Sequence, residues 1–228
     1  MITIEIKNII KFYDEQDRNV SGQVSSITGL IGEDLGAGLI QHYFKALHRN
    51  CIIYNDSPTE GTKKGKWLDR WIKVKNTNES NYTYYQTEIK NWSSHSIGGK
   101  KIALSASLLE LNAYAKARFD EQWNYTADTL KNDNVSKVLK EMKKHPGILE
   151  DDEIKPLICF WYPIFHQDNI NPIDELFEVG CSLTKFRKVT FFSMSTYLRK
   201  LLAKGTTEIQ IEAPNIEARQ IILKDLLR

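Results

Sequence analysis

Two segments decide the fold that the sequence predicts: WLDRWIKV at residues 67–74 and YTYYQTEIK at residues 82–90. Both are rich in aromatic and β-branched side chains, which favour strands. Between them lies KNTNESN at residues 75–81, a polar stretch typical of a turn. We therefore expect the two segments to pair as an antiparallel β-hairpin.

The register of this hairpin brings two carboxylates together. If the chain turns about Asn78 and Glu79, residues whose numbers add up to 157 face each other, and Asp69 lies opposite Glu88. Directly opposed side chains share a face of the sheet, with Cβ atoms about 4.5–5.5 Å apart. Lys90 follows Glu88 by two positions and projects to the same face. A shift of one residue would send Asp69 to the other face, so the register is a stringent prediction.

Two carboxylates this close repel each other unless positive charge neutralises them. A hard divalent cation bound by oxygen ligands suits such a pair, so we expect Asp69 and Glu88 to hold Mg²⁺ or Mn²⁺. Lys90 would add an ammonium group that can orient an attacking water and stabilise negative charge on a phosphate. The alternative interpretation is a surface hairpin that carries a ladder of charges.

The Glu-x-Lys triplet alone carries little information, because the chain contains it four times. Glu5 has no acidic residue before it, and Glu153 lies in an acidic turn. Glu141 falls in a predicted helix, where a spacing of two puts the acid and the lysine on different faces. Among the four, Glu88 alone has an aspartate suitably placed on a preceding predicted strand.

The pattern of Asp69, eighteen intervening residues, then Glu88-x-Lys90 resembles the PD-(D/E)xK nuclease superfamily. The resemblance implies that Asp69 and Glu88 are metal ligands and that Lys90 is the catalytic lysine. The sequence departs from the superfamily at Leu68, where its name has proline. What the resemblance implies for function is a metal-dependent endonuclease that hydrolyses DNA phosphodiester bonds, in bacterial restriction or antiviral defence. The alternatives are an RNA-cleaving nuclease and a non-catalytic nucleic-acid- or protein-binding subunit of the same fold.

The superfamily often adds a glutamate from its first helix, and Glu33 is the candidate for this catalytic and metal-binding position. The alternative is that Glu33 is an acidic residue in the first turn of a helix, where the helix dipole favours it. A helical stripe of apolar residues covers residues 32–47. Helical steps from Glu33 reach the edge of that stripe, whereas Asp34 is expected to point outward. The three glycines of this segment lower its helix propensity, which suggests a close approach to a neighbouring backbone or a tight turn at its start.

The fold class that follows is α/β, with a restriction-endonuclease-like mixed β-sheet flanked by helices. We expect one domain over residues 1–228, with the motif core at about 30–105. Apolar runs predict strands at 51–54, 156–162 and 188–194, and the other predicted elements are a strand at 2–6, a mostly helical region at 104–145, helices at 174–179, 195–203 and 214–227, and an edge strand at 206–212.

Several polar residues near the hairpin are candidates for contacts with nucleic acid. Basic residues flank the first strand and follow a Gly-Gly pair, while Gln86 shares the face of Glu88. The candidates are Lys66, Arg70, Gln86, His95, Lys100 and Lys101. A second basic run, at residues 137–144, has helical spacing and is interpreted as a solvated face.

Composition limits the remaining possibilities. With 228 residues, 41% hydrophobic and 26% charged, the chain is neither disordered nor fibrous. The net charge of +2 is too small for binding nucleic acid by charge alone, so a local patch, a protein partner or a homodimer is expected to supply affinity. Its three cysteines are interpreted as reduced core thiols. No long apolar run is present, so we expect a cytoplasmic protein without a membrane partner.

Overall fold

The computed structural model of the chain describes residues 1–14, 21–54, 68–76, 81–90, 137–140, 142–161, 174–180 and 186–226. Within these ranges the helices are α1 (Ile6–Asp14), α2 (Ser21–Ala46), α5 (Met194–Ala203) and α6 (Pro214–Leu226), together with the short 3₁₀ helix η2 (Lys137–Leu139). The strands are β1 (Ile2–Glu5), β2 (Cys51–Tyr54), β3 (Arg70–Lys75), β4 (Tyr82–Lys90), β5 (Glu153–Phe160), β6 (Leu176–Gly180), β7 (Lys188–Ser193) and β8 (Glu208–Ile211).

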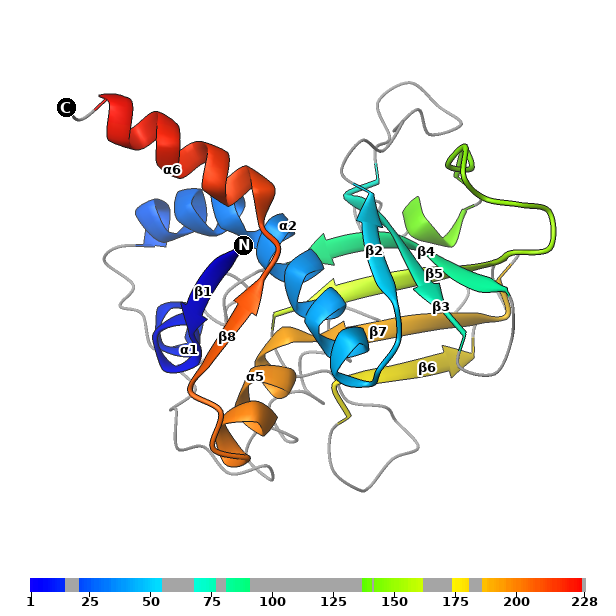
Figure 1. The fold of residues 1–228 in the computed structure, drawn as a ribbon, viewed down its shortest axis with the longest axis horizontal. Coiled ribbons are helices and arrows are strands. Elements are labelled where there is room, and N and C mark those ends of the chain that lie inside the picture. Colours follow the sequence, from blue (N-terminus) through cyan, green and yellow to red (C-terminus); the bar gives the residue numbers. More distant parts are fainter. Residues whose placement is uncertain are drawn as a thin grey trace.

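The strands form two sheets. The larger is mixed and has the order β2-β3-β4-β5-β7-β6, with β5 parallel to both β4 and β7 and the other neighbours antiparallel. β5 lies inside this sheet, which explains its continuous apolar run, because a parallel strand covered on both faces has no solvent side. The smaller sheet is the antiparallel pair β1-β8, which lies to one side of the larger sheet (Figure 1). The predicted α/β class with a mixed sheet is confirmed.

Helix α2 is the central connection between the two sheets. It contacts β2, β3 and β4 of the larger sheet and β8 and α6 on another side, and every residue from 34 to 41 is buried (Figure 1). A Cβ on Gly36 would lie 2.7 Å from Cγ2 of Ile89, and one on Gly38 would lie 2.9 Å from the carbonyl oxygen of Glu212. These two glycines therefore let α2 approach β4 and the end of β8 closely, as their presence in a helix suggested.

Some predicted elements differ from the structure. Residues 176–180 form strand β6 and not a helix, because Leu176 to Gly180 pair with β7 along their whole length. The predicted edge strand at 206–212 is β8, which belongs to the smaller sheet. Residues 142–145 lack the helix expected over 104–145, and most of that range lies outside the described residues. In the part of the chain that the structure describes, no helix is long and apolar enough to cross a membrane.

Candidate active site

The hairpin of β3 and β4 has the register that the sequence predicted. Arg70 lies opposite Thr87 and Lys75 opposite Tyr82, so the numbers of opposed residues add up to 157. Asp69 comes one residue before β3, and continuing the register places it opposite Glu88. The observed pairing of the two strands therefore agrees with the register expected from the sequence.

Glu88 and Lys90 form an ion pair at the end of β4. The Glu88 side chain is fully buried, its Oε1 accepts a hydrogen bond from the Lys90 ammonium, and the Lys90 side chain is 18% exposed. A contact between residues two apart on a strand confirms that both side chains share a face. Because a buried carboxylate is costly without compensating charge, Lys90 stabilises the ionised form of Glu88.

Asp69 is held beside this pair by the backbone. Its carboxylate accepts a hydrogen bond from the N–H of Ile89 at 2.7 Å, and Ile89 stands between Glu88 and Lys90 in the chain. Burial raises the pKa of the Cys159 thiol well above its ordinary value, and the negative charge of Asp69 raises this pKa further. Cys159 lies on β5 opposite Ile89, the residue whose N–H binds Asp69. The two observations therefore place the carboxylate of Asp69 at the same end of β4 and β5.

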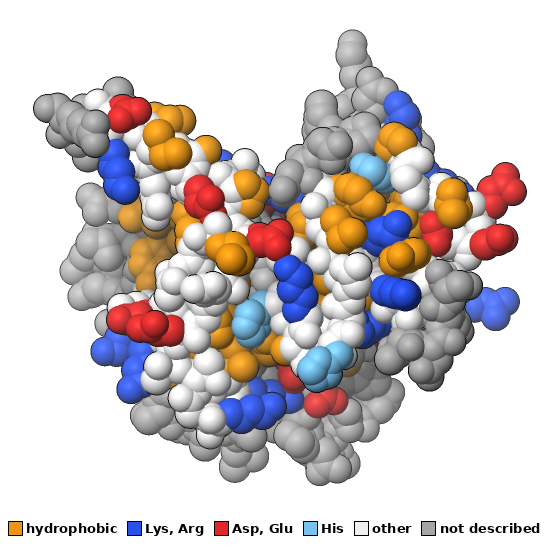
Figure 2. Space-filling view, viewed as in Figure 1, with side chains coloured by type: hydrophobic (Ala, Val, Ile, Leu, Met, Phe, Trp, Pro, Cys, Tyr) orange, Lys and Arg blue, Asp and Glu red, His pale blue; other side chains and the backbone are white. Residues whose placement is uncertain are grey.

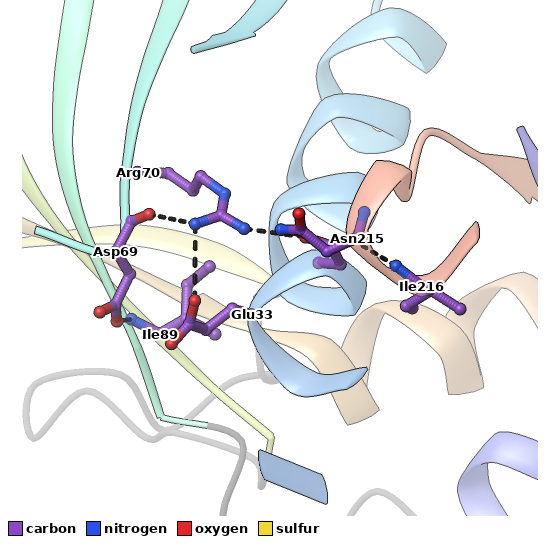
Figure 3. A network of polar contacts seen from close by, with 7 residues as sticks. Glu33, Asp69, Arg70, Ile89, Asn215 and Ile216 are labelled. Carbon is purple, nitrogen blue, oxygen red and sulfur yellow. Dashed lines mark hydrogen bonds and ion pairs between the residues drawn. The ribbon is translucent and has the colours of Figure 1, made fainter. Parts of the chain in front are cut away.

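Arg70 connects the hairpin to α2. Its Nη2 donates to Oδ1 of Asp34 at 2.8 Å, its Nη1 lies 3.5 Å from Oε2 of Glu33, and Nη1 also donates to the carbonyl oxygen of Asp69. Figure 3 shows the guanidinium between Asp69 and α2, with the side chains of Asp69 and Glu33 both directed toward Ile89. Arg70 therefore fixes the strand end that carries Asp69 relative to α2.

The predicted outward orientation of Asp34 is wrong, whereas Glu33 lies at the edge of the buried side of α2, as predicted. The Asp34 side chain is 2% exposed and that of Glu33 is 53% exposed. Asp34 accepts hydrogen bonds from the backbone N–H groups of Asn215 and Ile216 at 2.7 and 3.0 Å, and thereby caps the first turn of α6. β8 and α6 cover the side of α2 that carries Asp34. The apolar residues of this helix predict one buried side, and the second was not anticipated from the sequence.

Sequence reasoning missed Asp34, although a signal was present. Gly38 and Gln41 share its side of α2, and both are buried. A small residue and an uncharged polar residue at helical spacing from an acid are unusual for a solvated face, which more often carries charges. That pattern indicates a second buried side of the helix with satisfied polar groups.

Two predicted nucleic-acid contacts have other partners. Arg70 is buried and bound to carboxylates, and Gln86 is fully buried and donates its amide protons to the carbonyl oxygens of Val138 and Lys140. The structure thus gives both residues partners inside the protein, while the buried Nε of Arg70 has no hydrogen-bond partner among the described residues. The remaining candidates, Lys66, His95, Lys100 and Lys101, lie outside the described residues.

The charges around this site do not balance. Among the described residues, Glu33, Asp34, Asp69 and Glu88 supply four negative charges, and Arg70 and Lys90 supply two positive charges, which leaves a formal charge of −2. Oxygen donors with this net charge suit a hard divalent cation. The described residues include no cluster of three or more acidic, histidine or cysteine side chains arranged to hold a metal ion, so the structure does not group Glu33 with Asp69 and Glu88 as one ligand set.

A separate hollow lies at the other ends of the strands. It has a volume of about 700 Å³, and its lining includes Tyr85, Lys155, Glu178 and Thr190. The ammonium of Lys155 lies 3.0 Å from Glu178 and 3.3 Å from Glu153, so the charged groups of this hollow neutralise one another. This arrangement differs from the unbalanced charge at Asp69 and Glu88.

Comparison of the chain with protein-family models, with curated proteins and with solved structures finds no match in any of the three.

Proposed function

We propose that the protein is a metal-dependent endonuclease that hydrolyses phosphodiester bonds in DNA. One observation carries the proposal: the hairpin register holds the Asp69 carboxylate on the amide next to a buried Glu88, whose partner is Lys90. A surface charge ladder, the alternative interpretation, does not account for a glutamate that is fully buried. The α/β architecture with a mixed sheet is compatible with the restriction-endonuclease-like fold that the motif implies.

The donor chemistry of the site fits Mg²⁺ or Mn²⁺. Asp69 and Glu88 are the residues that would hold the ion. Its two positive charges would neutralise the formal charge of −2 that the four carboxylates, Arg70 and Lys90 of the site carry together. A bound divalent ion lowers the pKa of water and neutralises charge on a phosphate. Glu33, which is half-exposed and lies 3.5 Å from the Arg70 guanidinium, is proposed as an additional carboxylate outside the pair of Asp69 and Glu88.

The chain's own residues have distinct parts in hydrolysis. Water adds to phosphorus, the bond from phosphorus to the leaving sugar oxygen breaks, and that oxygen gains a proton while the water loses one. Lys90 is a partly exposed cation beside the proposed metal ligands Asp69 and Glu88. Its ammonium stabilises the additional negative charge of the phosphate as the bond between water and phosphorus forms. Arg70 acts as a positioning residue, because it holds the backbone of Asp69 through the carbonyl oxygen.

Cleavage of plasmid DNA, linear DNA and RNA with Mg²⁺ and with EDTA tests the proposal. We expect the intact protein to cut DNA with Mg²⁺ and not with EDTA, and Lys90→Ala to lower the rate by about 10²–10³-fold, as removal of one transition-state donor does. Lys155→Ala is the matched control, because Glu153-x-Lys155 is the same triplet with the same kind of ion pair on the adjacent strand β5.

The outcomes separate the alternatives. Mg²⁺-dependent cleavage of RNA without cleavage of DNA would change the proposed substrate and keep the site. Binding of nucleic acid without any cleavage would favour a non-catalytic subunit. Equal loss of activity in the Lys90 and Lys155 variants, both folded by circular dichroism, would remove the special role given to Lys90.

A further inference from the structure

The described residues 137–140 and 142–144, here called the basic segment, lie against the face of the sheet that carries Glu88 and Lys90. The side-chain amide of Gln86 donates to the carbonyl oxygen of Lys140 at 2.8 Å and also to that of Val138. Gln86 precedes Glu88 by two positions on β4, so both side chains project to the same face. The basic segment is therefore fixed beside the candidate active site.

The basic segment is anchored on one side and exposed on the other. Val138, Leu139 and Met142 are buried in the core, whereas Lys140, Lys143 and Lys144 are exposed. Among the described residues of this segment only the short 3₁₀ helix η2 is helical, and residues 142–144 have no helical structure. Three hydrogen bonds of the Gln86 side chain, to Val138, Lys140 and Met142, attach this backbone to the sheet.

The spacing matches a nucleic-acid backbone. Two residues along a strand span about 6.6 Å, so the backbone of Lys140 is fixed about that far along β4 from Glu88. Phosphates of one DNA strand succeed each other at about 3.4 Å along the helix axis. We place the DNA strand along β4 with its reacting phosphate at Glu88 and Lys90, and in that orientation the phosphates about two nucleotides away reach the level of Gln86 and Lys140.

We infer that the basic segment binds the phosphate backbone of the DNA beside the scissile bond, with Lys140 and Lys144 as phosphate contacts. This inference rests on the proposed function, because the reacting phosphate defines the position of the neighbouring ones. Such contacts set the register of a substrate without reading its sequence. These lysines also supply a local positive patch. The chain needs such a patch to bind DNA, because its net charge is only +2 and Figure 2 shows charges of both signs mixed over one face.

Salt-dependent binding to a labelled duplex tests the inference. Each lysine that neutralises a phosphate of B-DNA adds about 0.9 to the slope of the logarithm of the binding constant against the logarithm of the salt concentration. We expect the double variant Lys140→Ala/Lys144→Ala to lose about 1.8 of that slope. Between about 50 and 200 mM salt, the intact protein should then lose about twelvefold more affinity than the variant. Binding is measured in EDTA, so that cleavage does not interfere.

The matched control is Lys7→Ala/Lys224→Ala, which removes two exposed lysines from α1 and α6. Figure 1 places these helices at the end of the molecule away from β2, β3 and β4. The control should keep the slope of the intact protein. A second test is Gln86→Leu, which retains every lysine but removes the three side-chain hydrogen bonds that hold the segment, and it should weaken binding of the folded protein in the same salt range.

The results distinguish this inference from the proposed function. An unchanged slope in the Lys140/Lys144 variant, while the intact protein cleaves DNA with Mg²⁺, overturns the inference and leaves the function standing. A reduced slope without any cleavage supports the inference as a binding surface and overturns the nuclease. Equal loss of slope in both double variants shows a diffuse charge effect and overturns the inference. Binding of RNA with the same lysine dependence supports the surface and changes the polymer.

Discussion

Replacing Asp34 with alanine is expected to destabilise the protein by about 3–5 kcal/mol. The substitution leaves the Arg70 guanidinium, whose side chain is 10% exposed, without its 2.8 Å partner. Removing one member of a buried ion pair costs about 3–5 kcal/mol, because the remaining charge is uncompensated. The same substitution removes the acceptor of two N–H groups at the start of α6, and this lost capping, worth about 1 kcal/mol, places the expected cost in the upper part of that range.

Glu33→Ala is the matched control, since the two acids are neighbours on α2 and contact the same arginine. Glu33 is 53% exposed and 3.5 Å from Arg70, so its loss should cost no more than about 1 kcal/mol. Thermal unfolding provides the readout. For a chain of this size, about 3–5 kcal/mol corresponds to a fall in Tm of about 6–20 °C, against a few degrees for the control.

A further pair of variants separates the charge from the cap. Asp34→Asn keeps an acceptor for α6 but removes the negative charge, so it should retain part of the stability even if Asp34→Ala does not fold. Arg70→Met combined with Asp34→Ala removes both charges and should recover part of the loss caused by Asp34→Ala alone. A fall in Tm for Glu33→Ala as large as that for Asp34→Ala would refute the buried position of Asp34 and restore the outward orientation read from the sequence.

Two further predictions concern packing and pH. Gly36→Ala should destabilise the protein by about 1–3 kcal/mol, because the new Cβ lies 2.7 Å from Cγ2 of Ile89. Gly29→Ala in the same helix is the control: its new Cβ meets nothing within 4 Å, so it should stabilise the protein by up to about 1 kcal/mol. Equal melting temperatures of the two variants would contradict the close contact at Gly36. Hydrogen bonds from Lys45 and Gln41 lower the pKa of Glu212 below its ordinary value of 4.5. The contribution of the Glu212 carboxylate to stability is therefore present above pH 4.5 and is lost as the pH falls toward the lowered pKa. Between about pH 5 and pH 3, Glu212→Gln should thus lose less stability than the intact protein. Parallel curves of Tm against pH for the two proteins would show that this linkage is absent.

The hairpin could be predicted from the sequence because its information is local. A polar turn and two strands of alternating character define which residues oppose each other, and the observed pairing of Arg70 with Thr87 follows from that alone. Residues 174–179 gave no such information. Asp174-Glu175 before Leu176 suggests a helix start, and antiparallel pairing with β7, the next strand along the chain, decided for a strand.

The partners of polar residues could not be predicted, because they come from elements far away in the chain. Gln86 shares a face with Glu88, as expected, yet its amide is occupied by carbonyl groups more than fifty positions later. Arg70 lies beside the motif, as expected, and its guanidinium binds Asp34 on α2. In both cases the sequence specified the direction of the side chain, and the tertiary structure specified what it meets.

The connection from α6 to the candidate site follows from these long-range partners. Asn215 and Ile216 bind Asp34, Asp34 binds Arg70, and Arg70 binds the backbone of Asp69, so the start of α6 is linked to the candidate metal ligand through three successive polar contacts (Figure 3). Each contact in this series involves a buried or partly buried group, where a lost partner is costly. Because Asp69 lies outside β3 and is held on one side by Ile89 and on the other by Arg70, its position depends on the packing of α2 and α6 as well as on the hairpin. An intact hairpin is therefore necessary for the site but not sufficient, and a substitution at Asp34 should lower cleavage even under conditions where the protein remains folded.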